Sequence, residues 1–313
     1  MSNLSFSSTA SVQQPISTPP RLSIIIPTYD RPDFLPATVD QLLRQDFTNF
    51  ELIIIDQSPN PPPLRHSDPR ISYHRVPARG LPMARNEGIS RARGAIVLFL
   101  DDDVEIQGQG FLDAHLVYYG NPNIGGVGGH VVDRVNVPNA RRTRDTVTWT
   151  GRIVHNLTGS RSCALESARG ANMSFRAEVF QQIGGFDPGY TGTAFLEETD
   201  FATRMRAAGW ILMFSPGACL VHFSAPRGGV RADPQAGELS RFHNTGYYIA
   251  KHRGLVGLLP VIPTFGAIAL KRAWKSRNLG VLPSLSRAML EGIRAGLTLR
   301  MEHRRTGYPG ICR

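Results

Sequence analysis

Residues 95–103 read AIVLFLDDD, in which six apolar residues lead directly into three aspartates. A similar arrangement occurs at 22–30, where LSIII precedes PTYD, and at 51–58, where ELIII precedes DQS. Short runs of β-branched and aliphatic residues bounded by polar residues are typical of buried strands. Pro32 and the helical spacing of the apolar residues after it predict a helix between the first two runs. This alternation predicts an α/β fold with a mostly parallel central sheet flanked by helices.

Each of the three apolar runs ends in a carboxylate, at Asp30, Asp56 and Asp101 to Asp103. In open α/β sheets, ligands bind at the edge where the parallel strands end. A single aspartate after a strand is commonly a helix cap or a turn residue, and this is the simpler interpretation of Asp30 alone. Three adjacent carboxylates repel one another, and a divalent cation relieves that repulsion. The sequence therefore predicts a Mg²⁺ or Mn²⁺ site at Asp101 and Asp103.

The composition is that of an ordinary folded protein. The chain has 313 residues, of which 41% are hydrophobic and 19% charged, and this excludes a wholly disordered chain or a fibrous repeat. Three scattered cysteines are too few for a disulfide framework or a zinc cluster. Residues 1–20 contain no apolar block, so we expect a disordered leader and not a signal peptide. The α/β pattern occupies 21–235, and 236–313 form a helical, basic C-terminal region.

The net charge of +10 comes from this C-terminal region. Residues 241–313 contain 13 Lys and Arg residues against two Glu residues, a local charge of +11. Evenly spread positive charge would indicate nucleic-acid binding. Positive charge concentrated in an apolar region instead favours an anionic membrane surface as the partner, and no nucleic acid.

Two patterns in the C-terminal region bear on how it meets a membrane. The uncharged segment 255–270 is shorter than the roughly 20 residues of a straight span. An apolar stripe recurs every four residues with arginines placed off it, as in a helix that lies in the lipid interface; it consists of Leu285, Met289, Ile293 and Leu297. We expect peripheral attachment to the cytoplasmic face of a membrane. The alternative is that these helices pack on the α/β domain or on a second subunit.

The motifs resemble those of the family 2 nucleotide-sugar glycosyltransferases, which have the Rossmann-like GT-A fold. The resemblance rests on SIIIPTYDRP at 23–32, the strand ending in Asp56, ARN at 84–86 and LDDD at 100–103. These motifs occur in the family's order, and the likeness extends from about residue 21 to about residue 225. Two positions depart from the family. Asp30 stands where Asn is usual, and Gln57 stands where an acidic or small residue is usual.

The resemblance implies a donor site at the carboxyl ends of the strands. Thr28, Asp30 and Asp56 would border the base and ribose of the nucleotide, and Asp56 would accept a hydrogen bond from the base. Arg85 would approach the nucleotide or its phosphates, with an ordinary surface arginine as the open alternative. The complete set implied to bind the nucleotide sugar is Pro27, Thr28, Tyr29, Asp30, Asp56, Arg85, Asp101 and Asp102.

The resemblance also implies a metal site made of Asp101, Asp103 and His222. Asp103 would bind Mn²⁺ or Mg²⁺ directly, and Asp101 would act on the ribose or through water. His222 ends an apolar run, and some relatives have a histidine there that completes the metal shell; a structural histidine is the alternative. Because no glycine-rich phosphate loop is visible, the cation would neutralise most of the charge of the diphosphate.

Glu197-Glu198-Thr199-Asp200 places three acidic residues at the start of a predicted helix. Acidic residues interact favourably with the helix dipole there, and capping explains two of them but not all three. The segment resembles the family's E-D-x-D stretch, whose second acid is the catalytic base. Glu198 takes that position, with Glu197 and Asp200 as alternatives. The implied reaction is an inverting displacement in which this base takes a proton from a hydroxyl of a glycan or lipid-linked acceptor.

Two functions from other classes compete with this interpretation. A nucleotidyltransferase acting on sugar phosphates should carry a glycine-rich loop with a basic residue near its first strand, and residues 27–32 contain no glycine. A non-catalytic protein that binds a membrane or a polyanion would account for the basic C-terminal region. It would leave Asp101 to Asp103 and the acidic cluster at 197–200 without a role.

Overall fold

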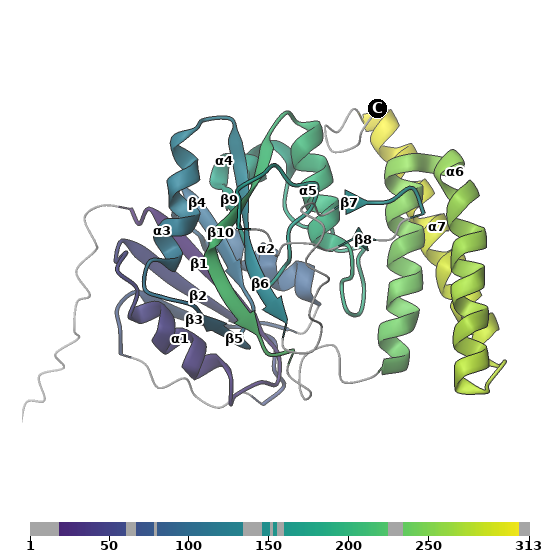
Figure 1. Ribbon diagram of the computed structural model, residues 1–313, viewed down its shortest axis with the longest axis horizontal. Coiled ribbons are helices and arrows are strands. Elements are labelled where there is room, and N and C mark those ends of the chain that lie inside the picture. The colour runs from purple at the N-terminus through teal and green to yellow at the C-terminus, as the bar shows by residue number, and fades with distance from the viewer. Residues whose placement is uncertain are drawn as a thin grey trace, which may run out of the picture.

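The chain folds into an α/β domain with a helical region at one end (Figure 1). The computed structural model describes residues 19–60, 67–77, 80–133, 146–150, 153–154, 160–224 and 234–306, so nearly all of the expected leader lies outside the described residues. The strands are β1 (Leu22–Thr28), β2 (Phe50–Asp56), β3 (Ile71–Arg75), β4 (Ile96–Leu100), β5 (Val104–Ile106), β6 (Ile124–Asp133), β7 (Thr146–Val147), β8 (Ile153–Val154), β9 (Asn172–Arg176) and β10 (Ile211–His222). The helices are α1 (Leu35–Leu43), α2 (Leu81–Arg91), α3 (Phe111–Leu116), the 3₁₀ turn Val117–Gly120, α4 (Ala177–Ile183), α5 (Glu197–Ala207), α6 (Pro234–Ser276) and α7 (Val281–Thr306).

Eight strands form the central sheet in the order β3-β2-β1-β4-β9-β6-β10-β5. Four neighbouring pairs are parallel, namely β1 with β2, β1 with β4, β2 with β3, and β6 with β10. The other three pairs are antiparallel, because β9 runs against both β4 and β6 and β5 runs against β10. The predicted α/β fold with a mostly parallel central sheet flanked by helices is therefore confirmed. The antiparallel strands β9 and β5 were not predicted.

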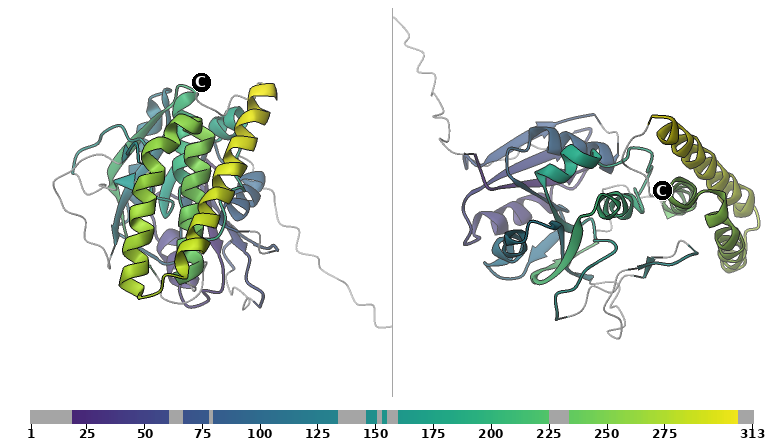
Figure 2. Two further views of the ribbon diagram at one scale, coloured as in Figure 1. Left: turned by 90° about the vertical axis from the view of Figure 1, so that its right-hand side faces the viewer. Right: turned by 90° about the horizontal axis from the view of Figure 1, so that it is seen from above.

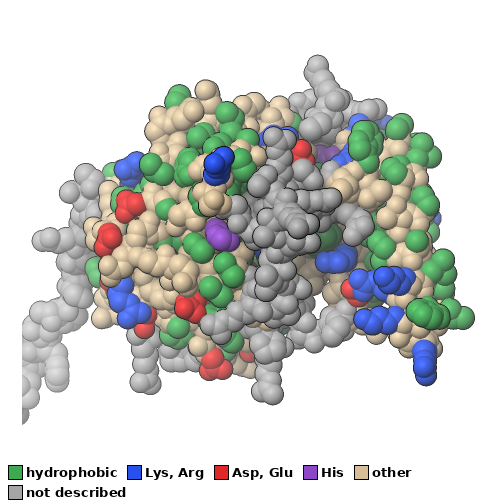
Figure 3. Space-filling model, in the orientation of Figure 1, with side chains coloured by type: hydrophobic (Ala, Val, Ile, Leu, Met, Phe, Trp, Pro, Cys, Tyr) green, Lys and Arg blue, Asp and Glu red, His purple; other side chains and the backbone are tan. Residues whose placement is uncertain are grey.

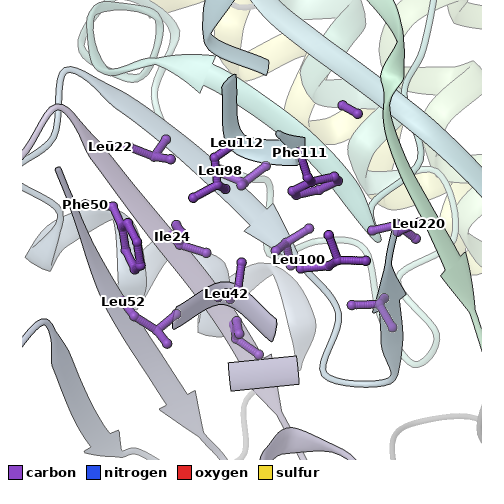
Figure 4. Close-up of a cluster of buried hydrophobic side chains, with 14 of the residues drawn as sticks. Leu22, Ile24, Leu42, Phe50, Leu52, Leu98, Leu100, Phe111, Leu112 and Leu220 are labelled. Atoms are coloured by element: carbon purple, nitrogen blue, oxygen red, sulfur yellow. The ribbon is translucent and has the colours of Figure 1, made fainter. Parts of the chain in front are cut away.

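The near-continuous apolar runs of the first strands are explained by burial on both faces of the sheet. Alternate residues point to opposite sides, so Ile24 and Leu98 pack with α1 and α3 while Ile25 and Phe99 pack with α2, α4 and α5. Figure 4 shows the first of these two cores, with Leu42 of α1 and Phe111 of α3 lying over the strands. The parallel register, in which Thr28 pairs with Asp56, brings the polar strand ends together.

Helix α6 is broken at Gly254, whose backbone angles (φ 63°, ψ −157°) are not helical. This positive φ is readily adopted only by glycine. The break divides α6 into an inner arm (residues 234–253) and an outer arm (residues 255–276), which lie side by side with α7 in Figure 2. The inner arm faces the α/β domain, and a third core joins both arms and α7 to Tyr190 and Leu196 of that domain.

The apolar stripe of α7 is buried within this helical region. Leu285, Met289 and Ile293 are each at most 8% exposed and pack with Tyr247 and other residues of α6, and Leu297 packs against the same core. The prediction that this stripe lies in a lipid interface is therefore wrong. The stripe has most of its apolar partners in α6, in a core that also includes Tyr190 and Leu196 of the α/β domain, whereas the alternative interpretation named the α/β domain or a second subunit.

Candidate active site

Asp101, Asp103 and His222 form the group among the described residues that could hold a metal ion. His222 Nε2 lies 3.3 Å from Asp101 Oδ2 and 3.1 Å from Asp103 Oδ1. The two aspartates follow β4, whereas His222 ends β10 and is brought to them by the antiparallel pairing of His222 with Val104 of β5. The backbone N–H of Phe223 also donates a hydrogen bond to the carbonyl of Asp103, at 3.0 Å. The sheet thus joins residues more than a hundred positions apart in the sequence.

The donor atoms of this group suit a divalent cation. Two carboxylate oxygens and an imidazole nitrogen are ligands that Mn²⁺ accepts, and Mg²⁺ prefers the oxygens. The other ring nitrogen of His222, Nδ1, lies 3.3 Å from Ser224 Oγ. With its proton on Nδ1, next to this hydroxyl, His222 would present the Nε2 lone pair to a cation held between it and the carboxylates, which is the tautomer that binds a metal.

Asp102 is not part of this group, and it is bound by β1, Arg31 and α1. Its carboxylate accepts hydrogen bonds from Thr28 Oγ1 of β1 (2.6 Å) and from Arg31 Nη1 (2.9 Å), and its carbonyl accepts one from Thr38 Oγ1 of α1 (2.7 Å). Burial raises the pKa of Asp102 to about 6, against the opposing effect of Arg31. Arg31 also lies 3.1 Å from Asp103 Oδ2, so one guanidinium lies against two of the three carboxylates.

A pocket of about 620 Å³, its open mouth included, lies beside these residues at the carboxyl ends of β1, β2 and β4. Five of its lining residues were expected at the donor site: Pro27, Thr28, Tyr29, Asp101 and Asp102. The other lining residues are Arg31, Gln57, Leu81, Ala84 and Thr193. Thr193 is the contribution of the loop before α5. The pocket therefore lies between the strand ends and the segment that leads into the acidic helix.

Asp30 and Asp56 lie at the ends of β1 and β2 near this pocket. The backbone of Asp30 is in the left-handed region (φ 55°), which Asn and Asp adopt more readily than other non-glycine residues, and its N–H donates to Ser58 Oγ at 2.7 Å. Asp56 is 5% exposed. Its carboxylate accepts hydrogen bonds from the Ser58 N–H (2.7 Å) and from the hydroxyl of Tyr73, which fix its orientation.

Arg85 is buried and joins the metal group to the acidic helix α5. Its side chain is 1% exposed; Nη1 pairs with Glu197, Nη2 donates to the Gly170 carbonyl at 3.0 Å, and Nη2 lies 3.9 Å from Asp101 Oδ1. Burial lowers the pKa of Arg85, and the charges of Asp101 and Glu198 act against this. The half-buried Glu198 is therefore at the same end of the sheet as the metal group. The burial of Arg85 contradicts the alternative of an ordinary surface arginine, whereas its approach to the nucleotide or its phosphates stays a prediction.

Asp200 points to the helical region and not to the pocket. Its Oδ1 lies 2.5 Å from Lys251 Nζ and 2.7 Å from His252 Nε2, both in the inner arm of α6, and its Oδ2 accepts a hydrogen bond from Arg204 at 2.8 Å. Burial alone would raise the pKa of Asp200, but Lys251 and then Arg204 hold it well below its usual value. Of the three acidic residues at the start of α5, Glu198 is the one that is not fully buried.

Sequence reasoning missed four residues of this site: Arg31, Tyr73, Thr193 and Lys251. Arg31 carried a usable signal, because it directly follows Asp30 in the quoted motif. Tyr73 and Thr193 lie in segments with no recognisable pattern, and Lys251 lies in the basic C-terminal region; only the folded chain brings these residues to the strand ends or to α5.

Proteins similar in sequence include an O-antigen biosynthesis protein and a glucosyltransferase. The chain is 26% identical over 245 residues to the O-antigen biosynthesis protein RfbC of Myxococcus xanthus, covering 72% of this chain and 19% of that protein. It is 33% identical over 95 residues to the GalNAc(5)-diNAcBac-PP-undecaprenol beta-1,3-glucosyltransferase of Campylobacter jejuni, covering 28% of this chain and 31% of that protein. The chain thus matches less than a third of the length of either relative.

Solved structures with the same fold include two glycosyltransferases. The mannosyltransferase PcManGT of Pyrobaculum calidifontis, in complex with GDP-Man and Mn²⁺, superposes with a TM-score of 0.53 at 18% identity, over 93% of this chain and 80% of that chain. GalNAc-T7 with UDP, GalNAc and Mn²⁺ superposes with a TM-score of 0.58 at 13% identity, over 94% of this chain and 59% of that chain. These likenesses confirm the GT-A fold.

The sequence model described as Glycosyl transferase family 2 matches residues 23–184, which is more than half of the chain. The matched range contains β1, β2 and β4 with their polar ends, Arg85, and the three aspartates at 101–103. The chain therefore belongs to glycosyl transferase family 2, a family of glycosyltransferases, and it has the GT-A fold.

Proposed function

We propose that the chain transfers a sugar, with inversion, from a nucleoside-diphosphate sugar to a hydroxyl of a glycan or lipid-linked acceptor. The observation that carries this proposal is the joining of two acidic groups at one edge of the sheet. The group of Asp101, Asp103 and His222 borders the strand-end pocket, and the buried Arg85 connects Asp101 to the first turn of α5, where Glu198 lies.

The strand-end pocket is the proposed donor site. Thr28, Tyr29 and Gln57 line it where β1 and β2 end, which is the edge at which open α/β sheets bind ligands. Asp56, oriented by the Tyr73 hydroxyl, would accept a hydrogen bond from the base. Solved structures of the same fold contain GDP-Man or UDP with Mn²⁺, which supports a nucleoside diphosphate as the donor's leaving group.

Asp101, Asp103 and His222 would hold Mn²⁺ or Mg²⁺ beside this pocket. When bound, the cation would supply a Lewis acid for the negative charge that develops on the departing diphosphate. The residues of the chain provide the two carboxylates and the imidazole, and Arg31 pairs with both Asp102 and Asp103 beside them. Of the two cations, Mn²⁺ suits this donor set of two carboxylates and an imidazole best.

Glu198 is the proposed general base. A hydroxyl is a poor nucleophile until a carboxylate accepts its proton as the new bond forms. Glu198 is half-buried in the first turn of α5, and its charge acts on the buried Arg85 guanidinium, which also lies 3.9 Å from Asp101. Glu197 is occupied by Arg85, and Asp200 by Lys251 and Arg204. A single displacement with one base and one cation site inverts the configuration at the anomeric carbon.

The outer arm of α6 is the proposed site of contact with a membrane that would contain a lipid-linked acceptor. Among the described helices, α6 is the one long and apolar enough to cross a membrane, with a mean hydropathy of 1.7 over its most apolar 18 residues. The outer arm buries one apolar face in the helical region and exposes another that contains Leu255, Val256, Leu259, Ile262, Leu270 and Trp274. Figure 3 shows hydrophobic side chains along this outer edge, with Lys and Arg at its lower end.

An apolar face next to exposed Lys271, Lys275 and Arg277 suits the interface of an anionic bilayer. The break at Gly254 returns the outer arm alongside the inner arm, so we propose peripheral attachment and not a span. The active site would then face the cytoplasm, with sugar nucleotides on one side and lipid-linked acceptors within reach.

Release of nucleoside diphosphate from UDP-, GDP- and dTDP-sugars, with Mn²⁺ or Mg²⁺, tests the proposal. Wild-type protein should slowly hydrolyse one donor, since water can replace the acceptor. Asp103→Ala should lose both hydrolysis and cation-dependent nucleotide binding, while Glu198→Gln should lose hydrolysis and keep nucleotide binding.

Asp113→Ala is the matched control, because Asp113 is an exposed acidic residue of α3 outside the site. Hydrolysis by Asp103→Ala at the wild-type rate would remove the cation site from the reaction. Wild-type hydrolysis by Glu198→Gln would assign the base to another residue. Hydrolysis by none of the proteins, together with no binding of any nucleoside diphosphate, would refute the proposal as a whole.

A further inference from the structure

The loop at 187–196, between α4 and α5, has an unusual backbone just before the acidic helix. Ala194 (φ 53°) and Leu196 (φ 77°) both have left-handed backbone angles that residues with a side chain rarely adopt. Both are buried, at 1% and 0% exposure. Leu196 directly precedes Glu197, so its backbone angle sets the direction in which α5 begins. Such strained conformations persist only where surrounding contacts hold them.

The inner arm of α6 supplies contacts that hold this loop. Asn244 is 0% exposed, and its side-chain amide binds both polar groups of the Thr191 backbone: Oδ1 accepts from the N–H at 3.2 Å and Nδ2 donates to the carbonyl at 3.0 Å. One turn earlier, Ser240 Oγ donates to the same carbonyl at 2.8 Å and accepts from the N–H of Thr193 at 3.0 Å. Thr193 lines the strand-end pocket, so these bonds act directly on a wall of the donor site.

Ionic contacts from the same arm hold both ends of the loop. Lys251 Nζ lies 2.6 Å from Asp187 Oδ2 at its start and 2.5 Å from Asp200 Oδ1 in the first turn of α5. Tyr247 donates a hydrogen bond to Asp187 at 2.8 Å, and His252 adds a second contact to Asp200. Gly189 permits this close approach, since a Cβ there would overlap the Tyr247 hydroxyl.

We propose that the inner arm of α6 positions the catalytic helix, with Asn244, Ser240 and Lys251 as positioning residues for Glu198. The inference rests on the proposed function, because it assumes that Glu198 is the base. The family match ends at residue 184, so both the loop and the arm lie outside it. The C-terminal helices are therefore part of the catalytic apparatus and not a separable attachment. Displacing a reacting group by about 1 Å can lower a rate about 100-fold. The inner arm makes three hydrogen bonds to Thr191 of the loop and two contacts to Asp200 in the first turn of α5.

Asn244→Ala is the decisive variant, and Arg272→Ala is its control. Arg272 is in the outer arm and pairs with Glu238 of the inner arm, so its removal disturbs the helical region without touching the loop. Three quantities are measured: kcat for hydrolysis of the donor identified above, the Kd of its nucleoside diphosphate with Mn²⁺, and amide hydrogen exchange over 191–200. For Asn244→Ala we expect kcat to fall about 100-fold, a much smaller rise in Kd, and faster exchange confined to this segment.

Unchanged kcat in Asn244→Ala with faster exchange over 191–200 would overturn the proposal, because the loop would then be loosened without consequence for the reaction. An equal loss of kcat in Arg272→Ala would also overturn it, since any disturbance of the helices would then suffice. Should Asn244→Ala unfold globally, Ser240→Ala removes a single hydroxyl and is judged by the same three quantities.

Lys251 gives an independent check through a conservative variant. Lys251→Arg keeps the positive charge between Asp187 and Asp200 and should retain more of kcat than Lys251→Met at equal amounts of folded protein. Equal kcat in the two variants would contradict the positioning role of the charge. If Glu198→Gln hydrolyses the donor at the wild-type rate, the proposed function fails, whereas the exchange measurement still reports whether the inner arm orders α5.

Discussion

Replacing Lys251 by methionine tests how firmly the helical region is joined to the α/β domain. The Lys251 side chain is 2% exposed and its Nζ is within 2.6 Å of both Asp187 and Asp200. Methionine fills a similar volume without the charge. Removing one partner of a buried ion pair costs about 3–5 kcal/mol. Because Arg204 and His252 still bind Asp200, we expect the lower value, a decrease of about 3 kcal/mol in the free energy of unfolding at pH 7.

The same variant should also lose stability in acid sooner than the wild type. Burial opposes the ionised form of Asp200, and Lys251 is the largest influence that holds its pKa well below the usual value. A carboxyl whose pKa is lowered on folding stabilises the protein above its unfolded pKa of about 3.9, and this stability is lost as the pH falls through the folded pKa. Without Lys251 the folded pKa rises, so the loss should begin at a higher pH.

Urea unfolding followed by circular dichroism, at several pH values between about 4 and 7, measures both effects. Arg272→Met is the matched control, because its pair with Glu238 is about one-third exposed and such surface pairs contribute less than about 1 kcal/mol. The double variant Lys251→Met/Asp200→Asn should regain part of the lost stability, since it removes the buried negative charge as well. If Lys251→Met were as stable as Arg272→Met over this pH range, the described ion pairs would not join the two regions as we argue.

Three further predictions concern the donor site, the loop and the membrane face. Tyr73→Phe removes a hydrogen-bond donor to Asp56, and calorimetry should show roughly three- to tenfold weaker binding of the nucleoside diphosphate. Unchanged affinity would show that Asp56 does not contact the nucleotide base. Gly189→Ala should lower the free energy of unfolding by about 1–3 kcal/mol, because its Cβ would overlap the Tyr247 hydroxyl; a neutral effect would show that the loop can move away from α6. Leu259→Ser/Trp274→Ser changes two exposed side chains, so it should leave folding intact yet reduce co-sedimentation with vesicles containing anionic lipid. Vesicle binding equal to that of the wild type would contradict membrane contact. So would a wild-type protein that binds no vesicles and forms a dimer that the double variant loses.

The sequence by itself determined the strands and the polar residues at their ends. Apolar runs such as 22–26 and 96–100 are continuous because both faces of these strands are buried, and this pattern depends only on neighbouring residues. Asp101 and Asp103 were recognisable for the same reason, since adjacent carboxylates after a strand require a local explanation. The order of these motifs was enough to predict the family and the GT-A fold, and both are confirmed.

The folded chain alone decided which distant residues meet at these strand ends. His222 joins the aspartates only because β5 and β10 pair in antiparallel register, and Arg85 reaches Glu197 only because α2 and α5 pack on the same face of the sheet. The sequence assigned α6 to a basic membrane-binding region, yet Lys251 of that helix is buried against Asp200. Ion pairs and strand pairing between remote segments depend on the three-dimensional path of the backbone, and no local spacing of residue types encodes that path.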